Sequence, residues 1–436
     1  MNILIAPVGN IERYEEVTYV IENTEKKSKV SFSILEEIKK TEKIIIIALD
    51  TLADKGKNYE EIEEDVKNKI FSFIKKEKLL KSENLDVMVA PGVGRFSGNK
   101  IFKGNMRDYY SFLFYHLSKI FLEGDEPLEI YLDLSHGINY MPVLTYQAIK
   151  EAGALVAIKR EVKLETYNSD PVTGKPSIDD KFQINMVNEE IIEFTIKKYS
   201  DSRIQKFRQI KPINENYYVD NEKRREFDKE FAFFQQEAHE ILAFLGAVFH
   251  GLLLPIFRFY PDIENIEKRL EHTFKKWRDS INLTRKNEEL ICERKLTFTE
   301  FFEVLVKALV LARCLNLERK EVVQLSEVEE LFKKFFAPLM VGNFIDNEIR
   351  TFREVKEKNI EDWKPLIEIK MEGSGKKVQP ASPHQRNFFA HAGFEGNAVM
   401  VKKEGDSLLI KYNEKFIEII KNYCCEGIRC LKKTFS

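Results

Sequence analysis

Two side chains near the C-terminus, Arg386 and His391, are the pair in this 436-residue chain best suited to chemistry. Arginine binds phosphate oxygens through a planar fork of donors, and histidine exchanges protons near neutral pH. A fixed arginine beside a fixed histidine therefore suits the cleavage of a phosphodiester. The spacing alone is also compatible with two residues that serve only the fold.

The residues around this pair predict a short helix over about 383–392. Ser382 is expected to be the N-cap, Pro383 the first helical residue and Gly393 the stop signal. Phe388 lies between the two polar residues and can pack the helix into a core. The pair would then be held still.

Ideal helix geometry places Asn387 closer to His391 than Arg386 is. Residues four apart differ by about 40° around the axis, and residues five apart by roughly 140°. Asn387 is therefore predicted to orient His391. Arg386 must either curl around the helix or act beside a histidine of a second chain.

Composition and charge limit the classes to which the chain can belong. Its 43% apolar and 32% charged residues indicate a soluble, folded protein of two or three domains. Sixty-nine basic and 71 acidic residues exclude a generally basic nucleic-acid coat protein. We expect no membrane span and no signal peptide. An odd number of cysteines indicates reduced thiols in the cytoplasm. Cys424 and Cys425 would be a poor zinc site, because no histidine lies nearby to complete four ligands. We expect neither a metal nor a cofactor.

The first half of the chain alternates buried strands with amphipathic helices, which predicts a parallel sheet covered on both faces. This is a Rossmann-like α/β domain, extended by a hairpin at 162–168 and 181–187. The predicted strands are residues 2–6, 43–49, 85–90, 129–134 and 154–158, and the main helices are residues 59–80, 106–121 and 141–152.

Long helical patterns replace this alternation from about residue 189 onward. They cover residues 231–257, 263–291, 297–315 and 320–336, followed by a small hairpin at 398–402 and 408–412 and a final helix over 413–431. We therefore predict an α/β domain at 1–190, a charged linker at 191–222 and a mainly α-helical region at 223–436.

Small and polar residues follow four of the predicted strands. In open α/β sheets the carboxyl ends of parallel strands share one edge, where ligands bind. The chain has neither a Gly-x-Gly-x-x-Gly fingerprint after the first strand nor a Walker-type lysine, which disfavours ordinary NAD and ATP sites. The candidate ligand-binding residues are Gly9, Asn10, Asp50, Thr51, Gly92, Gly94, Arg95, Phe96, Ser135, His136, Gly137, Ile138 and Asn139.

These motifs together resemble a known family. The run at 133–142, with the turns at 9–10 and 92–96, resembles the CARF domain of CRISPR-associated accessory proteins. The helix with Arg386, Asn387 and His391 resembles the catalytic motif of HEPN ribonucleases. In this order they resemble the CARF–HEPN accessory ribonucleases of type III CRISPR systems (Csx-one type). The resemblance covers the first 190 residues and roughly the last 60, whereas the helical middle matches only in position and composition.

The resemblance implies a cytoplasmic endoribonuclease of antiviral defence that forms a homodimer or a higher homo-oligomer. The CARF domain would bind a cyclic oligoadenylate activator, usually cyclic tetra-adenylate, with the strand tips. Binding would switch on metal-independent cleavage of single-stranded RNA by the HEPN domain, with Arg386, Asn387 and His391 as catalytic residues.

The chemistry of these residues agrees with that reaction. RNA carries its own nucleophile, the 2′-OH, so proton transfer and charge stabilisation suffice. His391 would transfer the proton and Arg386 would neutralise charge at phosphorus. The alternative is a nucleotide-sensing binding protein whose helical half recruits a partner without catalysis. A lesser option is that the sensor domain also degrades its own ligand slowly.

Overall fold

The chain folds into two compact units and passes between them more than once. The computed structural model describes residues 1–81, 84–171, 180–199, 207–214, 217–218, 220–286, 289–372 and 381–429. Unit 1 consists of Met1–Phe194, Ile210–Phe227 and Glu271–Thr299, and unit 2 of Thr195–Gln209, Asp228–Leu270 and Glu300–Ser436. The predicted division at 191–222 differs from these units, because a segment from the predicted helical region belongs to unit 1. Part of that predicted linker lies outside the described residues.

An eight-stranded sheet forms the centre of unit 1, in the order β3-β2-β10-β9-β8-β1-β4-β5. Neighbouring strands from β9 to β5 pair in parallel, and β10 returns antiparallel beside β9. The predicted α/β architecture with its hairpin extension is confirmed. The strands are β1 Asn2–Pro7, β2 Val17–Ile21, β3 Thr24–Ser28, β4 Lys43–Leu49, β5 Leu85–Ala90, β8 Leu128–Asp133, β9 Val162–Ser169 and β10 Lys181–Ile191.

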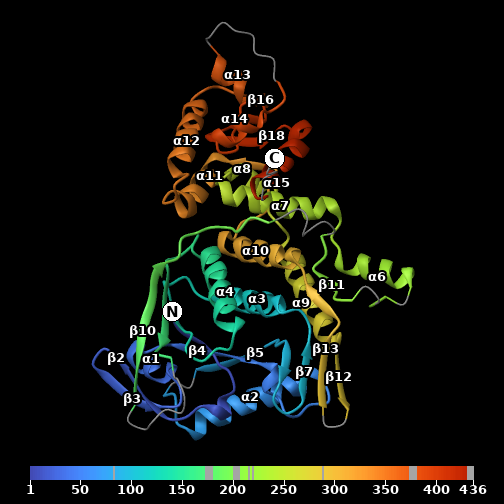
Figure 1. The fold of residues 1–436 in the computed structure, drawn as a ribbon. Helices are drawn as coiled ribbons and strands as arrows, with labels where there is room; N and C mark the ends of the chain where they lie inside the picture. The colour runs from blue at the N-terminus through green and yellow to red at the C-terminus, as the bar shows by residue number, and fades with distance from the viewer. Residues whose placement is uncertain are drawn as a thin grey trace, which may run out of the picture. The chain divides into compact units, whose positions relative to one another are not determined.

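Helices cover both faces of this sheet. Figure 1 shows α2 on one side of it and α3 and α4 on the other. Ile62, Val66 and Ile70 of α2 belong to the same buried cluster as Ile44 and Ile46 of β4. The helices are α1 Phe32–Lys39, α2 Tyr59–Lys76, α3 Arg107–Phe121 and α4 Tyr140–Val156, with short turns η1 Ile11–Arg13 and η2 Asp50–Leu52.

The predicted strand at 154–158 is wrong, because α4 continues to Val156. The last residues of that helix are all buried, so its end reads as a continuous apolar run. A short run of this kind does not distinguish a buried strand from a buried helix. The strand of the sheet begins later, at Val162.

A second, four-stranded sheet in unit 1 contains a segment that was predicted to be helical. Helix α9, Ile263–Asp279, is followed by the hairpin of β12, Ile281–Lys286, and β13, Glu289–Arg294. The helix predicted over 263–291 is therefore wrong beyond residue 279. Residues of β13 are alternately half-buried and buried, which is the two-residue period of a strand. The strand has only six residues, so this period is hard to recognise in the sequence. It pairs with β7 Lys100–Lys103, which pairs with β6 Gly94–Phe96, and β14 Leu296–Phe298 pairs with β11 Ile210–Pro212.

A buried ion pair attaches this hairpin to the main sheet. Arg294 at the end of β13 and Asp50 at the end of β4 both have fully buried side chains, and one guanidinium nitrogen of Arg294 binds the Asp50 carboxylate. A second nitrogen donates to the Gly92 carbonyl at 2.8 Å. Asp50 also accepts hydrogen bonds from the Tyr59 hydroxyl at 2.9 Å and the Gly92 N–H at 2.8 Å. The two charges are therefore paired within the core, although Nε of Arg294 has no hydrogen-bond partner among the described residues and burial raises the pKa of the Asp50 carboxyl.

Unit 2 is mainly helical and carries a small sheet in the order β15-β18-β17-β16. The predicted hairpin is confirmed, with Gly405 at its turn in the left-handed region at φ +60°. The remaining elements within the described residues are α6 Asn221–Phe231, α7 Gln235–His250, α8 Leu253–Arg258, α10 Glu300–Leu315, β15 Val322–Gln324, α11 Leu325–Leu331, η4 Phe332–Phe336, α12 Gly342–Lys356, β16 Lys364–Pro365, α13 Leu366–Met371, α14 Gln385–Ala390, β17 Val399–Glu404, β18 Ser407–Tyr412, η5 Glu414–Phe416 and α15 Ile417–Gly427.

No helix within the described ranges is both long and apolar enough to cross a membrane. The four cysteines in those ranges, Cys292, Cys314, Cys424 and Cys425, are buried free thiols. Cys430 lies outside the described residues.

Replacing Arg294 by methionine should destabilise unit 1 by about 3–5 kcal/mol, because Asp50 then keeps a buried charge without its partner. Urea unfolding of a Trp363→Phe background, in which Trp277 of unit 1 is the fluorescent reporter, measures this change. Lys181→Met is the matched control, because its ion pair with Glu25 is exposed and should contribute within about 1 kcal/mol. Equal unfolding midpoints for the two variants would contradict a structural role for the buried pair.

Candidate functional site

The predicted Arg–His helix exists as α14, but it is shorter than expected and begins later. Helix α14 starts at Gln385, and its N-cap is His384, without a side-chain capping bond. The prediction that Ser382 caps the helix and that Pro383 opens it is therefore wrong. Residues 381–384 lie outside the helix, and His384 has an extended backbone. The predicted stop is confirmed, because Gly393 adopts a φ of +84°.

Packing against neighbouring helices of unit 2 holds α14 in place. Phe388 is fully buried. The Tyr423 hydroxyl of α15 donates to the Pro383 carbonyl at 2.8 Å, just before the helix. On the α7 side, the rings of His250 and Phe389 lie 4.9 Å apart. These contacts fix a helix that, at six residues, is too short to be stable alone.

His391 lies at the C-cap of α14 and is held by a carboxylate from another helix. Its Nδ1 atom lies 2.8 Å from Oε1 of Glu348 on α12. The His391 side chain is 46% exposed, whereas that of Glu348 is 12% exposed. The other oxygen of Glu348 lies 3.5 Å from the ammonium of Lys370 on α13. A carboxylate at Nδ1 favours the tautomer with its proton there, which leaves Nε2 for chemistry.

The predicted orienting role of Asn387 is not what the structure shows. The backbone carbonyl of Asn387 accepts a hydrogen bond from the His391 N–H at 2.9 Å, but the ring itself is bonded to Glu348. Asn387 and Arg386 are both exposed. Arg386 has no carboxylate partner in the described part of the chain, so its guanidinium is available to an anion.

A pocket of about 470 Å³ lies at the carboxyl ends of the unit 1 strands. It brings together six of the predicted ligand-binding residues from four separate turns. These are Gly9, Asn10, Thr51, Arg95, Phe96 and Ile138. The pocket also contains Arg13, Lys69 and Lys100, which the sequence did not single out, because isolated basic residues are usually solvated. Lys69 and Lys100 are both paired with Asp54.

Other predicted ligand residues lie beneath this surface and stabilise the turns. Asp50 is fully buried in its ion pair with Arg294, so its carboxylate does not face the pocket. Ser135 donates to Asp133 at 2.5 Å and accepts from the Ser169 N–H at 2.9 Å. His136 accepts a hydrogen bond at Nε2 from the Ser31 N–H at 3.0 Å, and burial lowers the pKa of its imidazole.

Close packing accounts for three of the predicted glycines. A Cβ atom on Gly92 would lie 2.4 Å from the Thr51 methyl group, and one on Gly9 would lie 2.9 Å from Ile138. A Cβ on Gly137 would approach Pro142 and Pro7 to within 3.2 Å. Gly94 instead needs its backbone freedom, with a φ of +144°. Asn139, exposed at φ +45°, precedes α4 in an unusual backbone conformation.

Glu348 and Lys370 were missed because nothing in their local sequence marks them. Glu348 lies 43 residues before His391, inside an ordinary amphipathic helix. The one available signal was that the helical pattern leaves Glu348 on the buried side of α12, where a carboxylate requires a partner.

No cluster of three or more histidine, cysteine, aspartate or glutamate side chains within the described ranges is arranged to hold a metal ion.

Comparisons with known proteins agree with this division of sites. The family model described as "CRISPR system endoribonuclease Csx1, CARF domain" matches residues 3–171, which contain the strand-tip pocket. The model described as "CRISPR system endoribonuclease Csx1, HEPN domain" matches residues 340–414, which contain Glu348, Arg386 and His391. The chain is also 34% identical over 457 aligned positions to the CRISPR system endoribonuclease Csx1 of Methanocaldococcus jannaschii, covering 95% of this chain and 92% of that protein.

The Glu348 contact predicts the tautomer of His391. In protein labelled with ¹⁵N-histidine at pH 8, long-range ¹H–¹⁵N correlations should show the His391 proton on Nδ1. Glu348→Ala should move it to Nε2, and the spectrum of His391→Ala assigns the resonance. Glu329→Ala is the control, because Glu329 also pairs with α12, through Arg353 at 2.7 Å, but does not contact His391. An unchanged tautomer in Glu348→Ala would show that the contact does not orient the ring.

Proposed function

Because the chain belongs to the Csx1 family of CRISPR system endoribonucleases, with a CARF and a HEPN domain, we propose that it cleaves single-stranded RNA at α14. We propose further that a cyclic oligoadenylate in the strand-tip pocket controls this cleavage. The relative from Methanocaldococcus jannaschii supports the reaction class, since its name describes an endoribonuclease.

One observation carries the catalytic assignment, namely the hydrogen bond between His391 and Glu348. It fixes the imidazole through Nδ1, keeps Nε2 free and leaves nearly half of the side chain open to solvent. A positioned, accessible imidazole is what general acid–base catalysis requires.

The reaction follows from this geometry without a further reagent. The 2′-oxygen of RNA attacks the adjacent phosphorus and loses its proton, and the bond from phosphorus to the 5′-oxygen breaks. The leaving 5′-oxygen takes up a proton. His391 serves as the general acid or general base in these transfers, and Arg386 stabilises the charge at phosphorus. The products are a 2′,3′-cyclic phosphate and a 5′-hydroxyl.

A homodimer would complete the cleavage site. One chain offers a single His391, whereas attack and departure need a proton removed and a proton supplied. Two copies of α14 facing one another would supply two imidazoles and two guanidinium groups around one RNA strand. The exposure of Arg386, Asn387 and His391 is consistent with such a shared groove.

The strand-tip pocket has the chemistry to hold a cyclic oligonucleotide. Phe96 offers a ring for stacking a base, and Asn10 keeps its amide N–H groups free, because its oxygen accepts from Glu12. In the described part of the chain neither Arg13 nor Arg95 has a carboxylate partner, so both can bind phosphate. At about 470 Å³ the pocket fits part of a tetra-adenylate ring, and two copies across a two-fold axis would fit the whole.

The buried pair of Arg294 and Asp50 gives the activator a way to act on the rest of the chain. Arg294 contacts the turns after β4 and β5, which border the pocket, and the chain continues from β13 through β14 to α10 of unit 2. A ligand that shifts these turns therefore changes the position of the groups that bind the Arg294 guanidinium. Such a ligand controls activity only by binding two arrangements of the protein with different affinity.

The free thiols of the described cysteines support a cytoplasmic location.

Replacing His391 by alanine should reduce RNA cleavage by roughly 10²–10⁴-fold without changing folding, because it removes proton transfer. Arg386→Ala should have a similar effect, and Glu348→Gln should lower kcat more than it raises KM. Gel assays with labelled single-stranded RNA in EDTA measure all three, and the cleaved 3′ ends should carry cyclic phosphate. Glu329→Gln should retain parental activity. Full activity in His391→Ala would overturn the assignment and favour a non-catalytic sensor.

Changing Arg95 or Asn10 to alanine should weaken binding of cyclic tetra-adenylate by roughly tenfold, since each removes a donor to phosphate or base. Basal cleavage should be unaffected. Isothermal titration should give one ring per two chains, with the dimer mass confirmed by light scattering. Lys103→Ala on β7 is the control, because Lys103 is exposed but does not line the pocket. One ring per chain, in a protein that stays monomeric, would refute this binding geometry.

A further inference from the structure

Unit 1 contains a second and larger cleft, of about 1150 Å³. It lies between α2, α3, the end of α9 and the strands β5 and β12, and all of its lining residues belong to unit 1. It shares no lining residue with the strand-tip pocket. The proposed RNA cleavage and activator binding do not use it.

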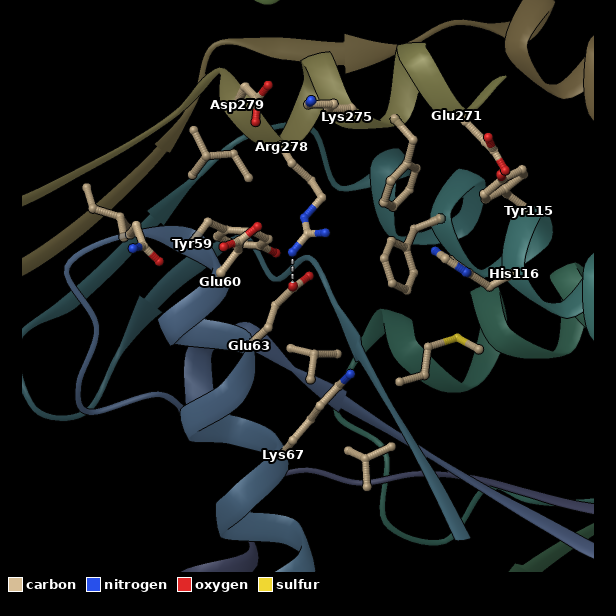
Figure 2. Close-up of a pocket in the computed structure, with 18 of the residues that line it drawn as sticks. Tyr59, Glu60, Glu63, Lys67, Tyr115, His116, Glu271, Lys275, Arg278 and Asp279 are labelled. Atoms are coloured by element: carbon tan, nitrogen blue, oxygen red, sulfur yellow. Dashed lines mark hydrogen bonds and ion pairs between the residues drawn. The ribbon is translucent and has the colours of Figure 1, made fainter. Parts of the chain in front are cut away.

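The cleft has an unpaired imidazole in its wall. The half-buried ring of His116 on α3 lines the cleft, and its Nε2 atom is buried without a hydrogen-bond partner in the described part of the chain. Figure 2 shows His116 on α3 and Lys67 on α2 among the side chains that line the cleft. An unpaired ring nitrogen is costly, and a polar ligand that reaches it after a small rotation of the ring removes that cost.

Cations surround this imidazole. Burial, together with Lys119, Arg278 and Lys67, lowers the pKa of His116 to about 4, so it is neutral at physiological pH. Lys67 has no ion-pair partner among the residues described. Arg278 is paired with Glu63, but burial raises the pKa of that carboxyl to about 7, so its charge is incomplete near neutrality. The carboxylates of Glu60, Asp86, Glu271 and Asp279 also line the cleft, and Lys119 is paired with Glu271 at 3.6 Å, so the place for an anion is confined to Lys67 and Arg278.

Aromatic rings form the adjoining wall. The ring centroids of Phe112 and Phe274 lie 4.5 and 5.1 Å from that of His116, and Tyr115 stacks on Phe274 at 5.6 Å. Tyr59 lines the opposite side, on α2. Tyr59, Phe112 and Tyr115 are buried, so the half-buried ring of Phe274 is the one on which a flat heterocycle that enters the cleft can stack.

The outer edges of two strands border the remaining sides of the cleft. β5 is the last strand of the main sheet and β12 is the last strand of the smaller sheet, and both line the cleft. One edge of each strand is therefore not paired with another strand. Backbone N–H and C=O groups on such edges can bond to the polar edges of a base.

We propose that this cleft is a binding site for a nucleoside phosphate, separate from the activator pocket. Its phosphate binds Lys67 and Arg278, and its base stacks on Phe274. Cations, flat rings and free backbone groups occur together here, which matches the three chemical parts of a nucleotide. The volume exceeds the roughly 300–1,000 Å³ of small-molecule sites, so the cleft also admits the end of a 5′-phosphorylated strand.

Calorimetric titration of the full-length protein with adenosine 5′-monophosphate tests this proposal. We expect saturable binding that Lys67→Ala and Phe274→Ala each weaken by roughly tenfold. Lys75→Ala is the control, because Lys75 is an exposed lysine on the same helix that does not line the cleft. Adenosine or inorganic phosphate that binds as well as the nucleotide would overturn the proposal. A 5′-phosphorylated tetra-adenylate arm distinguishes a strand end, which should bind at least tenfold more tightly, from a free nucleotide.

Photo-crosslinking locates the site in the wild-type chain, so the test does not depend on the folding of any variant. With 8-azidoadenosine 5′-monophosphate, labelled peptides should come from residues 57–67, 112–120 or 271–283. Labelling should persist in Asn10→Ala, which alters only the strand-tip pocket. Labels confined to residues 8–13 and 95–100, or no label at millimolar concentration, would exclude a nucleotide site in this cleft.

Discussion

The buried ion pair between Arg294 and Asp50 is the constraint on which the arrangement of unit 1 depends. Both side chains are fully buried, so neither charge can be hydrated, and each needs the other and the turn around Gly92. This requirement brings β13 back to the end of β4 across 244 positions of sequence. It also means that the strand-tip turns and the hairpin cannot move independently. The proposed control by an activator requires such a link between the strand-tip pocket and the chain that leads to α10.

The need to pair a buried carboxylate also organises the candidate catalytic centre in unit 2. The desolvation free energy is smaller there, because the groups are only partly buried. Glu348 is almost buried and is matched by His391 on one oxygen and by Lys370 on the other. Because three helices contribute one residue each, the imidazole is positioned by tertiary packing and α14 only presents it. Helix α14 itself is held by Phe388 and Tyr423. An exposed reactive group on a rigid support is the usual arrangement for binding a flexible strand.

Both candidate nucleotide sites of unit 1 place cations next to aromatic rings, but they differ in their supports. The strand-tip pocket is built from turns whose glycines allow close packing, as at Gly92 against Thr51. The larger cleft is built from helices and strand edges, and His116 is its unpaired polar group. Turns are the more adaptable support, which suits a site whose occupant must change the protein.

The sequence by itself determined the local features. Apolar runs predicted β1, β4, β5 and β8, the glycine after α14 predicted its end, and the motif near residue 136 indicated the family. Only the tertiary structure decided which residues contact one another. A hydrophobic pattern reports which face is buried but not against what, so β12 and the first half of β13 were predicted to be helical and Asp50 was predicted to bind the ligand. Glu348 was not identified for the same reason. Its role depends on a contact 43 positions away, which exists only once α12 packs beside α14.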